Sequence, residues 1–136
     1  MDLALLDTDI LSEILKQKNA MVLQRASLYL NEHSRFAISA FSRYEVYRGL
    51  KDKQATQQLA VFENFCQHVE IVEISSAILD RAAELWGDAR RGGHPRYDAD
   101  LIIASTALHL ARALVTGNTA HYAWITALTL EDWRRS

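Results

Sequence analysis

The chain has 136 residues, of which 49% are hydrophobic and 24% charged, so it can build a hydrophobic core. Its formal net charge of −2 argues against a protein that coats nucleic acid through bulk charge. Its one cysteine, Cys66, excludes an internal disulfide and fits a reducing compartment. The apolar residues between Asp2 and Asp7 are too few for a signal peptide, and no apolar run approaches the roughly eighteen residues of a membrane span. We therefore expect one cytoplasmic domain over residues 1–136, without a membrane segment.

The predicted elements alternate between strands and helices. Short apolar runs indicate buried strands, whereas apolar residues three and four apart indicate amphipathic helices. In chain order, strands are predicted at 3–6, 36–39, 69–74, 113–116 and near 128–130, and helices at 10–15, 20–31, 41–50, 55–67, 78–91 and 98–112, with a short helical piece in the tail. The one clear breaker is 91–95, which contains two glycines and the proline. This order predicts a helix-rich, three-layer α/β/α fold around a parallel sheet of four to five strands.

Polar residues follow or precede these elements at positions that a parallel sheet would bring together. Asp7 closes the first strand, Glu45 lies in the third helix, Asp98 and Asp100 open the helix after the breaker, and Asn118 follows the fourth strand. Sites in such sheets form beyond the carboxyl ends of the strands. Carboxylates without histidine or cysteine among them are ligands for hard cations such as Mg²⁺ or Mn²⁺. The pattern therefore predicts metal-assisted phosphodiester chemistry.

Each acidic residue also has a purely structural interpretation. Asp7 could cap the helix that follows it, and Asp98 and Asp100 could cap the later long helix, where a negative charge is worth about 0.3–1 kcal/mol. Glu45 could be a solvated residue of an amphipathic helix. The ordered occurrence of all four residues favours the functional interpretation over four separate structural ones.

The joint pattern resembles the PIN-domain ribonucleases and, within them, the VapC-type toxins of toxin–antitoxin pairs. Four segments carry the resemblance, in the family's order and over nearly the whole chain: Leu5-Leu6-Asp7-Thr8-Asp9-Ile10-Leu11-Ser12, Ser42-Arg43-Tyr44-Glu45-Val46-Tyr47-Arg48-Gly49-Leu50, Asp98-Ala99-Asp100-Leu101-Ile102-Ile103-Ala104, and Leu114-Val115-Thr116-Gly117-Asn118-Thr119-Ala120-His121-Tyr122. Two positions depart from the family pattern. Asn118 stands where many relatives have a fourth aspartate, and Tyr122 replaces the usual phenylalanine. We expect a core aromatic slot to tolerate this tyrosine.

Charge and resemblance together predict the roles of these residues. Crowded carboxylates stay ionised together only when a cation neutralises them, so Asp7 and Asp100 are predicted to hold Mg²⁺ directly. Glu45 and Asp98 are predicted to bind it through water or to support a second ion. Three further residues, Thr8, Thr116 and Asn118, are predicted to support this set. The resemblance implies hydrolysis to 5′-phosphate and 3′-hydroxyl ends.

Basic residues near the acidic set are candidates for RNA contact, although each could be a solvated helix end. The candidates are Arg43, Arg91, His94 and Arg96. His121 resembles a family position, and we expect a structural role for it. The resemblance implies a structured RNA substrate such as tRNA, with messenger or ribosomal RNA left open. It also implies a VapB-like antitoxin as partner and a homodimer.

Two other functions share part of this pattern. A haloacid-dehalogenase-type phosphatase would explain the Asp-x-Asp start at Asp7 and Asp9, but it needs a threonine or serine before its late acidic pair and then a lysine. Here Thr116 follows the pair at Asp98 and Asp100, and no lysine occurs after Lys53. The second rival is a catalytically silent PIN-fold module that binds RNA or protein. The presence of all four carboxylates favours the enzyme.

Overall fold

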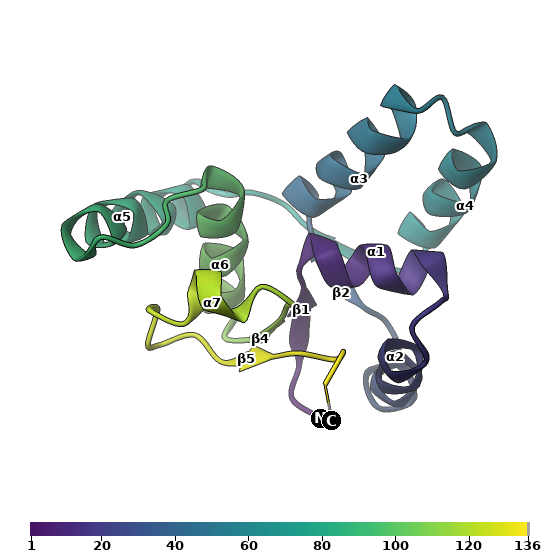
Figure 1. The fold of residues 1–136 in the computed structure, drawn as a ribbon, viewed down its shortest axis with the longest axis horizontal. Helices are drawn as coiled ribbons and strands as arrows, with labels where there is room; N and C mark the ends of the chain where they lie inside the picture. Colours follow the sequence, from purple (N-terminus) through teal and green to yellow (C-terminus); the bar gives the residue numbers. More distant parts are fainter. Residues whose placement is uncertain (136) are drawn as a thin grey trace.

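A five-stranded parallel sheet in the order β3-β2-β1-β4-β5 organises the protein (Figure 1). The structure is a computed structural model that describes residues 1–135. The strands are β1 (Ala4–Leu6), β2 (Ala37–Ser39), β3 (Glu70–Val72), β4 (Ala113–Val115) and β5 (Leu130–Glu131). The helices are α1 (Thr8–Lys16), α2 (Ala20–His33), α3 (Ala40–Asp52), α4 (Thr56–Cys66), α5 (Ser76–Gly92), α6 (Asp98–Leu110) and α7 (Thr119–Tyr122). The predicted α/β fold with a parallel sheet is confirmed.

Alternating side chains of the central strand divide the core into two layers of packing. Leu6 belongs to one cluster, with residues of α1, α2 and α4, whereas its neighbour Leu5 belongs to the other, with residues of α5 and α6. Successive side chains of a strand lie on opposite faces of a sheet, so each face of β1 is covered by its own helices. The result is the predicted three-layer arrangement, with α1 and α2 on one side and α5 and α6 on the other (Figure 1).

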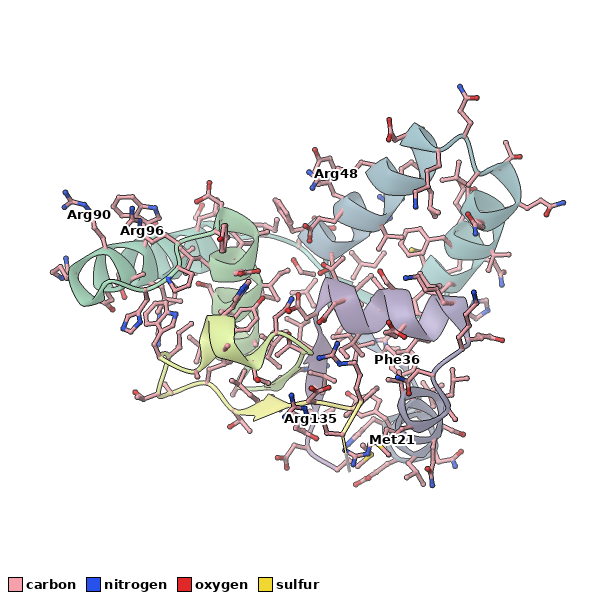
Figure 2. All side chains as sticks on the ribbon, in the orientation of Figure 1. Met21, Phe36, Arg48, Arg90, Arg96 and Arg135 are labelled. Carbon is pink, nitrogen blue, oxygen red and sulfur yellow. The ribbon has the colours of Figure 1, made fainter. Side chains whose placement is uncertain are left out.

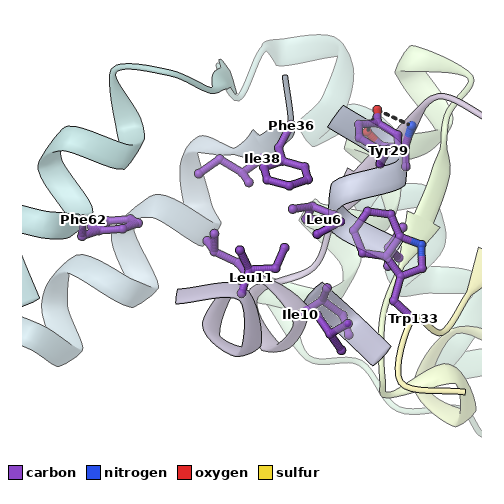
Figure 3. Packing of buried hydrophobic residues seen from close by; sticks show 13 residues of the cluster. Leu6, Ile10, Leu11, Tyr29, Phe36, Ile38, Phe62 and Trp133 are labelled. Atoms are coloured by element: carbon purple, nitrogen blue, oxygen red, sulfur yellow. Dashed lines mark hydrogen bonds between the residues drawn. The ribbon is translucent and has the colours of Figure 1, made fainter. Parts of the chain in front are cut away.

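Large apolar and aromatic side chains fill the first of these clusters (Figure 3). Trp133, near the end of the described chain, is fully buried and lies 5.7 Å from Tyr29 and 6.4 Å from Phe36, measured between ring centroids. The Tyr29 hydroxyl accepts a hydrogen bond from the Ala4 N–H at 3.1 Å. Burying a side chain of this size stabilises the fold by about 1.5–3 kcal/mol. Trp133 thus ties the C-terminal segment to α2 and to the sheet.

Several predicted boundaries shift by a few residues. Helix α3 was expected to end near Gly49 but runs on to Asp52, because a glycine within a helix costs only about 1 kcal/mol and packing outweighs it. The last strand was expected near 128–130 and is found at Leu130–Glu131. The predicted breaker is real: α5 ends at Gly92, and Gly93 adopts the left-handed conformation, with φ 70°, that favours glycine.

The register of the sheet brings three residues at strand ends side by side. Leu6 of β1 is paired with Ile38 of β2 and with Val115 of β4. The next residues along the three strands therefore share one edge of the sheet, at the carboxyl ends of the strands. They are Asp7, Ser39 and Thr116. Separately, no helix within residues 1–135 is long and apolar enough to cross a membrane.

Candidate functional site

Asp7 is the buried centre of the predicted site and is 5% exposed. It follows β1 in an extended conformation and caps α1, because its Oδ1 accepts a hydrogen bond from the Thr8 N–H at 2.8 Å. Its second oxygen, Oδ2, accepts from the Thr116 hydroxyl of the neighbouring strand end at 2.8 Å. The capping and site interpretations of Asp7 are therefore compatible, since each uses a different oxygen.

Within residues 1–135, no arginine, lysine or histidine forms an ion pair with Asp7. Burial, with a smaller contribution from the charge of Asp9, raises the pKa of Asp7 to about 6, although hydrogen bonds from Thr116, Thr8 and Tyr122 act in the opposite direction. Burial also raises the pKa of Asp9, which accepts hydrogen bonds from its own helix and from the Gly117 N–H at 2.9 Å. The centre of the site is therefore a place where negative charge is poorly compensated.

Asp100 meets Asp7 through a single hydroxyl group. The Tyr122 hydroxyl lies 3.0 Å from Asp7 Oδ2 and 3.1 Å from Asp100 Oδ1. Asp100 Oδ2 in turn lies 3.0 Å from His121 Nδ1, and the Asp100 side chain is 24% exposed. Burial and the two neighbouring carboxylates raise the pKa of Tyr122, so this phenol stays protonated. The two predicted direct ligands, Asp7 and Asp100, are thus joined by one shared donor.

Glu45 reaches the same region from α3, and Thr8 connects it to the centre. The Thr8 hydroxyl lies 2.8 Å from Glu45 Oε1 and 2.9 Å from the buried Ser42 hydroxyl. Glu45 Oε2 also lies 3.9 Å from Arg48, one helical turn further on. The supporting role of Thr8 stays a prediction, and the structure places its hydroxyl beside Glu45. Asp7 and Glu45 are therefore linked through one residue, Thr8, which bonds to both.

Asp98 and Asn118 lie at the rim of this arrangement. Asp98 is exposed at the first residue of α6, and no hydrogen bond or ion pair of its side chain is found in the described part of the chain. Neither it nor Asp100 caps the helix, because the cap position belongs to Tyr97 and has no side-chain bond. The exposed Asn118 contributes its backbone N–H, which donates to the Thr116 hydroxyl at 3.0 Å.

Each of the predicted RNA-contacting residues contacts another side chain of the protein. Arg43 lies over the Tyr47 ring at 5.1 Å, and Arg91 pairs with Asp88 at 2.7 Å. His94 stacks on Trp124 with 5.0 Å between centroids, and Arg96 lies over Trp86 at 5.3 Å. Figure 2 shows Arg90 and Arg96 toward the outer end of α5, and Arg48 on α3. None of these contacts joins a predicted RNA-contacting residue to Asp7, Glu45, Asp98 or Asp100.

The chemistry of these carboxylates fits a hard divalent cation such as Mg²⁺. Within residues 1–135, no three Asp, Glu, His or Cys side chains stand close enough to form a metal site on their own. Mg²⁺ does not require such a cage, since it keeps several waters and binds through one or two carboxylates together with phosphate oxygens. Asp7 and Asp100 offer that pair, and the uncompensated charge on Asp7 favours a cation beside it.

The sequence missed the hydroxyl of Tyr122 as a member of this set. Its ring was expected only to fill an aromatic slot in the core, and it does lie in the second core cluster, 1% exposed. A buried tyrosine hydroxyl nevertheless needs a hydrogen-bond partner. That requirement, together with the departure from phenylalanine at this position, was the signal in the sequence.

The PIN domain family model matches residues 4–123, which include every carboxylate described above. The chain belongs to the PIN-domain family. The resemblance to VapC-type members is also confirmed, because the similar curated proteins carry that name. A tRNA(fMet)-specific endonuclease VapC of Shigella flexneri is 28% identical over 95% of this chain and 96% of its own length. Ribonuclease VapC1 of Haemophilus influenzae strain R2866 is 26% identical over 96% of this chain and 98% of its own length.

Solved structures of similar sequence share this PIN fold over nearly their whole length. The DNA-bound VapBC of Salmonella typhimurium matches with a TM-score of 0.87 at 26% identity, covering 98% of this chain and 99% of the other. VapBC2 of Rickettsia felis, bound to a DNA fragment from its promoter, matches with a TM-score of 0.85 at 26% identity, covering 96% and 98%. These toxin–antitoxin complexes therefore contain the same fold, in which the site of this chain lies at the carboxyl ends of β1 and β4.

Proposed function

We propose that this PIN domain is a metal-dependent endoribonuclease that acts as the toxin of a VapC-type toxin–antitoxin pair. The observation that carries the proposal is the junction of Asp7 and Asp100 through the Tyr122 hydroxyl, at the edge of the sheet where parallel strands end. The curated relatives support the reaction class, since they are named as a tRNA-specific endonuclease and a ribonuclease. In this proposal water attacks the phosphorus in line and the 3′-oxygen leaves, so the products carry 5′-phosphate and 3′-hydroxyl ends.

Mg²⁺ is the proposed cofactor, with Mn²⁺ as a substitute, and Asp7 and Asp100 would hold it directly. When bound there, such a cation neutralises the carboxylates, makes hydroxide available near neutral pH and stabilises the charge that builds on the phosphate. Glu45, fixed by Thr8, is placed to orient the attacking water or to bind the ion through water. Asp98, exposed at the rim, is assigned the same outer role.

Hydrogen bonds from the protein's own hydroxyl groups hold the carboxylates for this task. Thr116 donates to Asp7, and Thr8 contacts Glu45, so neither carboxylate depends on the cation for its orientation. Such preorganised second partners typically change metal affinity or activity by 10- to 100-fold when they are removed. Thr8 and Thr116 are therefore positioning residues in this proposal.

Cleavage of total cellular RNA by the purified, partner-free protein tests the enzyme directly. We expect cleavage with Mg²⁺ or Mn²⁺, none with EDTA, and loss of cleavage in Asp100→Asn, which removes charge and keeps shape. Asp80→Asn is the matched control, because Asp80 is exposed on α5, outside the site. If Asp100→Asn cleaves as well as the control, the assignment of ligands is wrong. If wild type neither cleaves nor binds Mn²⁺, the chain is the silent binding module.

The proposed protein partner is a VapB-like antitoxin, because the solved neighbours are VapBC complexes. A cleft of about 550 Å³ lies between α1, α3 and α4, with Leu15, Val46 and Phe62 among its apolar residues. Thr8 and Glu45 also line it, so a chain seated in the cleft would reach the carboxylates. An amphipathic helix in such a groove would bury apolar residues and cover the site.

Substitution of an exposed residue of this cleft tests the partner surface. Val61 lines the cleft and is 62% exposed, so Val61→Glu should leave the fold intact and prevent stable association with a co-expressed antitoxin. Leu28→Glu is the matched control, since Leu28 is 53% exposed on α2 and does not line the cleft. Size-exclusion chromatography of the two co-expressed pairs compares them. Light scattering of the free toxin tests the homodimer, which stays a prediction.

A further inference from the structure

An exposed aromatic ring lies one side chain away from a predicted metal ligand. Tyr97, directly before α6, is 60% exposed, and its ring lies 5.5 Å from that of His121 at an interplanar angle of 32°. His121 Nδ1 lies 3.0 Å from Asp100 Oδ2. A single imidazole therefore separates the Tyr97 ring from a carboxylate of the site. Because most of the Tyr97 side chain is exposed, core packing does not explain this ring.

His94 and Arg96, close to Tyr97 in the chain, each contact another aromatic ring. His94, three residues before it, stacks on Trp124 in a nearly parallel arrangement, at 5°, and the Trp124 indole N–H donates to the His121 carbonyl at 3.0 Å. Arg96, directly before Tyr97, lies over the 42% exposed Trp86. Flat rings interleaved with cations suit a ligand that has both aromatic faces and negative charge. Nucleic acid with unpaired bases has both, whereas a base pair within a duplex hides its faces.

We propose that Tyr97, whose ring packs against that of His121, is a stacking platform for an unpaired RNA base beside the bond that is cut. The proposal rests on the proposed ribonuclease function and adds to it a subsite, the Tyr97 ring. The base stacks on the exposed Tyr97 ring, and its phosphate then lies toward the Asp100 carboxylate. His121 is a positioning residue, because it contacts both the ring and the ligand.

Binding of a short, unstructured RNA oligonucleotide that contains 2-aminopurine tests the platform in EDTA, where the RNA stays intact. Loss of base–aromatic stacking weakens binding by roughly 5- to 100-fold, so Tyr97→Ala should bind that much more weakly, and the 2-aminopurine quenching seen with wild type should disappear. Tyr97→Phe keeps the ring and should bind within about twofold of wild type. Leu28 is an exposed apolar residue on α2, and Leu28→Ala should bind the oligonucleotide like wild type.

Independent measurements separate this proposal from the ribonuclease. Calorimetric Mn²⁺ binding should be unchanged in Tyr97→Ala, because the ring contacts no predicted ligand directly. If wild type cleaves RNA and Tyr97→Ala binds RNA equally well, the platform is wrong and the nuclease stands. If wild type binds RNA through Tyr97 but never cleaves it, the platform stands and the nuclease falls. Equal affinity for a matched duplex, or dissociation of a dimer in Tyr97→Ala, would overturn the platform.

Discussion

The site has a buried half and an exposed rim, and the same residue type behaves differently in each. Asp7, in the buried half, is 5% exposed, bonds to two hydroxyl groups and a backbone N–H, and has a pKa raised to about 6. Asp98, on the rim, is exposed and has no side-chain bond in the described part of the chain. Both were predicted from the sequence as members of one acidic set. The difference shows that the fold holds the Asp7 side chain in one position, at the cost of burying a carboxylate, whereas the Asp98 side chain is solvated.

Removing the charge at each position is the strongest way to test this difference. Asp7→Asn should lower cleavage by roughly 10²- to 10³-fold, because a buried ligand loses its charge and cannot be replaced by a neighbour. Asp98→Asn should lower it by less than about tenfold, because an exposed residue acts through water. Single-turnover cleavage with saturating Mn²⁺ measures both. A larger loss in Asp98→Asn than in Asp7→Asn would reverse the assignment of the two aspartates.

The pH dependence of stability should separate the halves next. Since the pKa of Asp7 is raised from 3.8 to about 6, the folded protein retains a proton that the unfolded chain releases across this window. The free energy of unfolding of the metal-free protein should therefore fall by about 3 kcal/mol as pH rises from about 4 to above 6. Asp7→Asn should flatten this fall, and Asp98→Asn should not.

Urea denaturation in EDTA across this pH range gives the measurement, and a second series with Mn²⁺ extends it. A cation that binds only the folded protein stabilises it by mass action, so Mn²⁺ should restore the stability that is lost above pH 6. Stability that rises with pH in the metal-free protein would mean that Asp7 is compensated by a partner, contrary to its burial without one.

The sequence predicted the sheet and the buried half well, because both depend on local patterns. Apolar runs ending at Leu6 and Val115 located the central strands, and the first polar residue after each run necessarily lies at the carboxyl edge. Helical spacing alone does not rank Asp98 against Asp100, and only the resemblance to the family assigned the direct ligand to Asp100. Residues two apart on a helix point to different faces, and only the packing of α6 against the sheet decides which faces inward.

The sequence could not supply the contacts of Tyr122 for a different reason. Its ring has the periodicity of a core residue, and it is one. The hydroxyl acquires its role only because Asp7 and Asp100, distant in the chain, converge on the same point. A hydrogen bond between three segments depends on tertiary packing, which no local pattern encodes.

Tyr122→Phe tests whether this hydroxyl anchors the buried half. The ring keeps its place, so the fold should lose only about 1 kcal/mol, the net value of a hydrogen bond. Asp7 and Asp100 lose their shared donor, and Mn²⁺ affinity should fall by roughly tenfold, as is common when outer partners of a ligand are removed. Calorimetry measures the affinity. Tighter Mn²⁺ binding in Tyr122→Phe would instead mean that the hydroxyl competes with the cation.

The smallest expected effect on cleavage is that of substituting Thr8, which lies between the buried half and the rim. Its hydroxyl has one proton and two oxygen neighbours, Glu45 Oε1 at 2.8 Å and Ser42 Oγ at 2.9 Å, so it donates to the carboxylate and accepts from the serine. Thr8→Val keeps the shape of the side chain but removes its hydrogen bond to Glu45, which then keeps only its ion pair with Arg48. Cleavage should slow by roughly three- to tenfold, less than the roughly 10²- to 10⁴-fold contribution of a positioned acid or base, because Glu45 is loosened and not removed. Thr8→Ser, which restores the hydroxyl, should recover most of the rate, and Mn²⁺ affinity should change little in either variant. If Thr8→Val cleaves as fast as wild type while Glu45→Gln is slow, Glu45 acts without Thr8, and the rim is organised by the solvent and Arg48 alone.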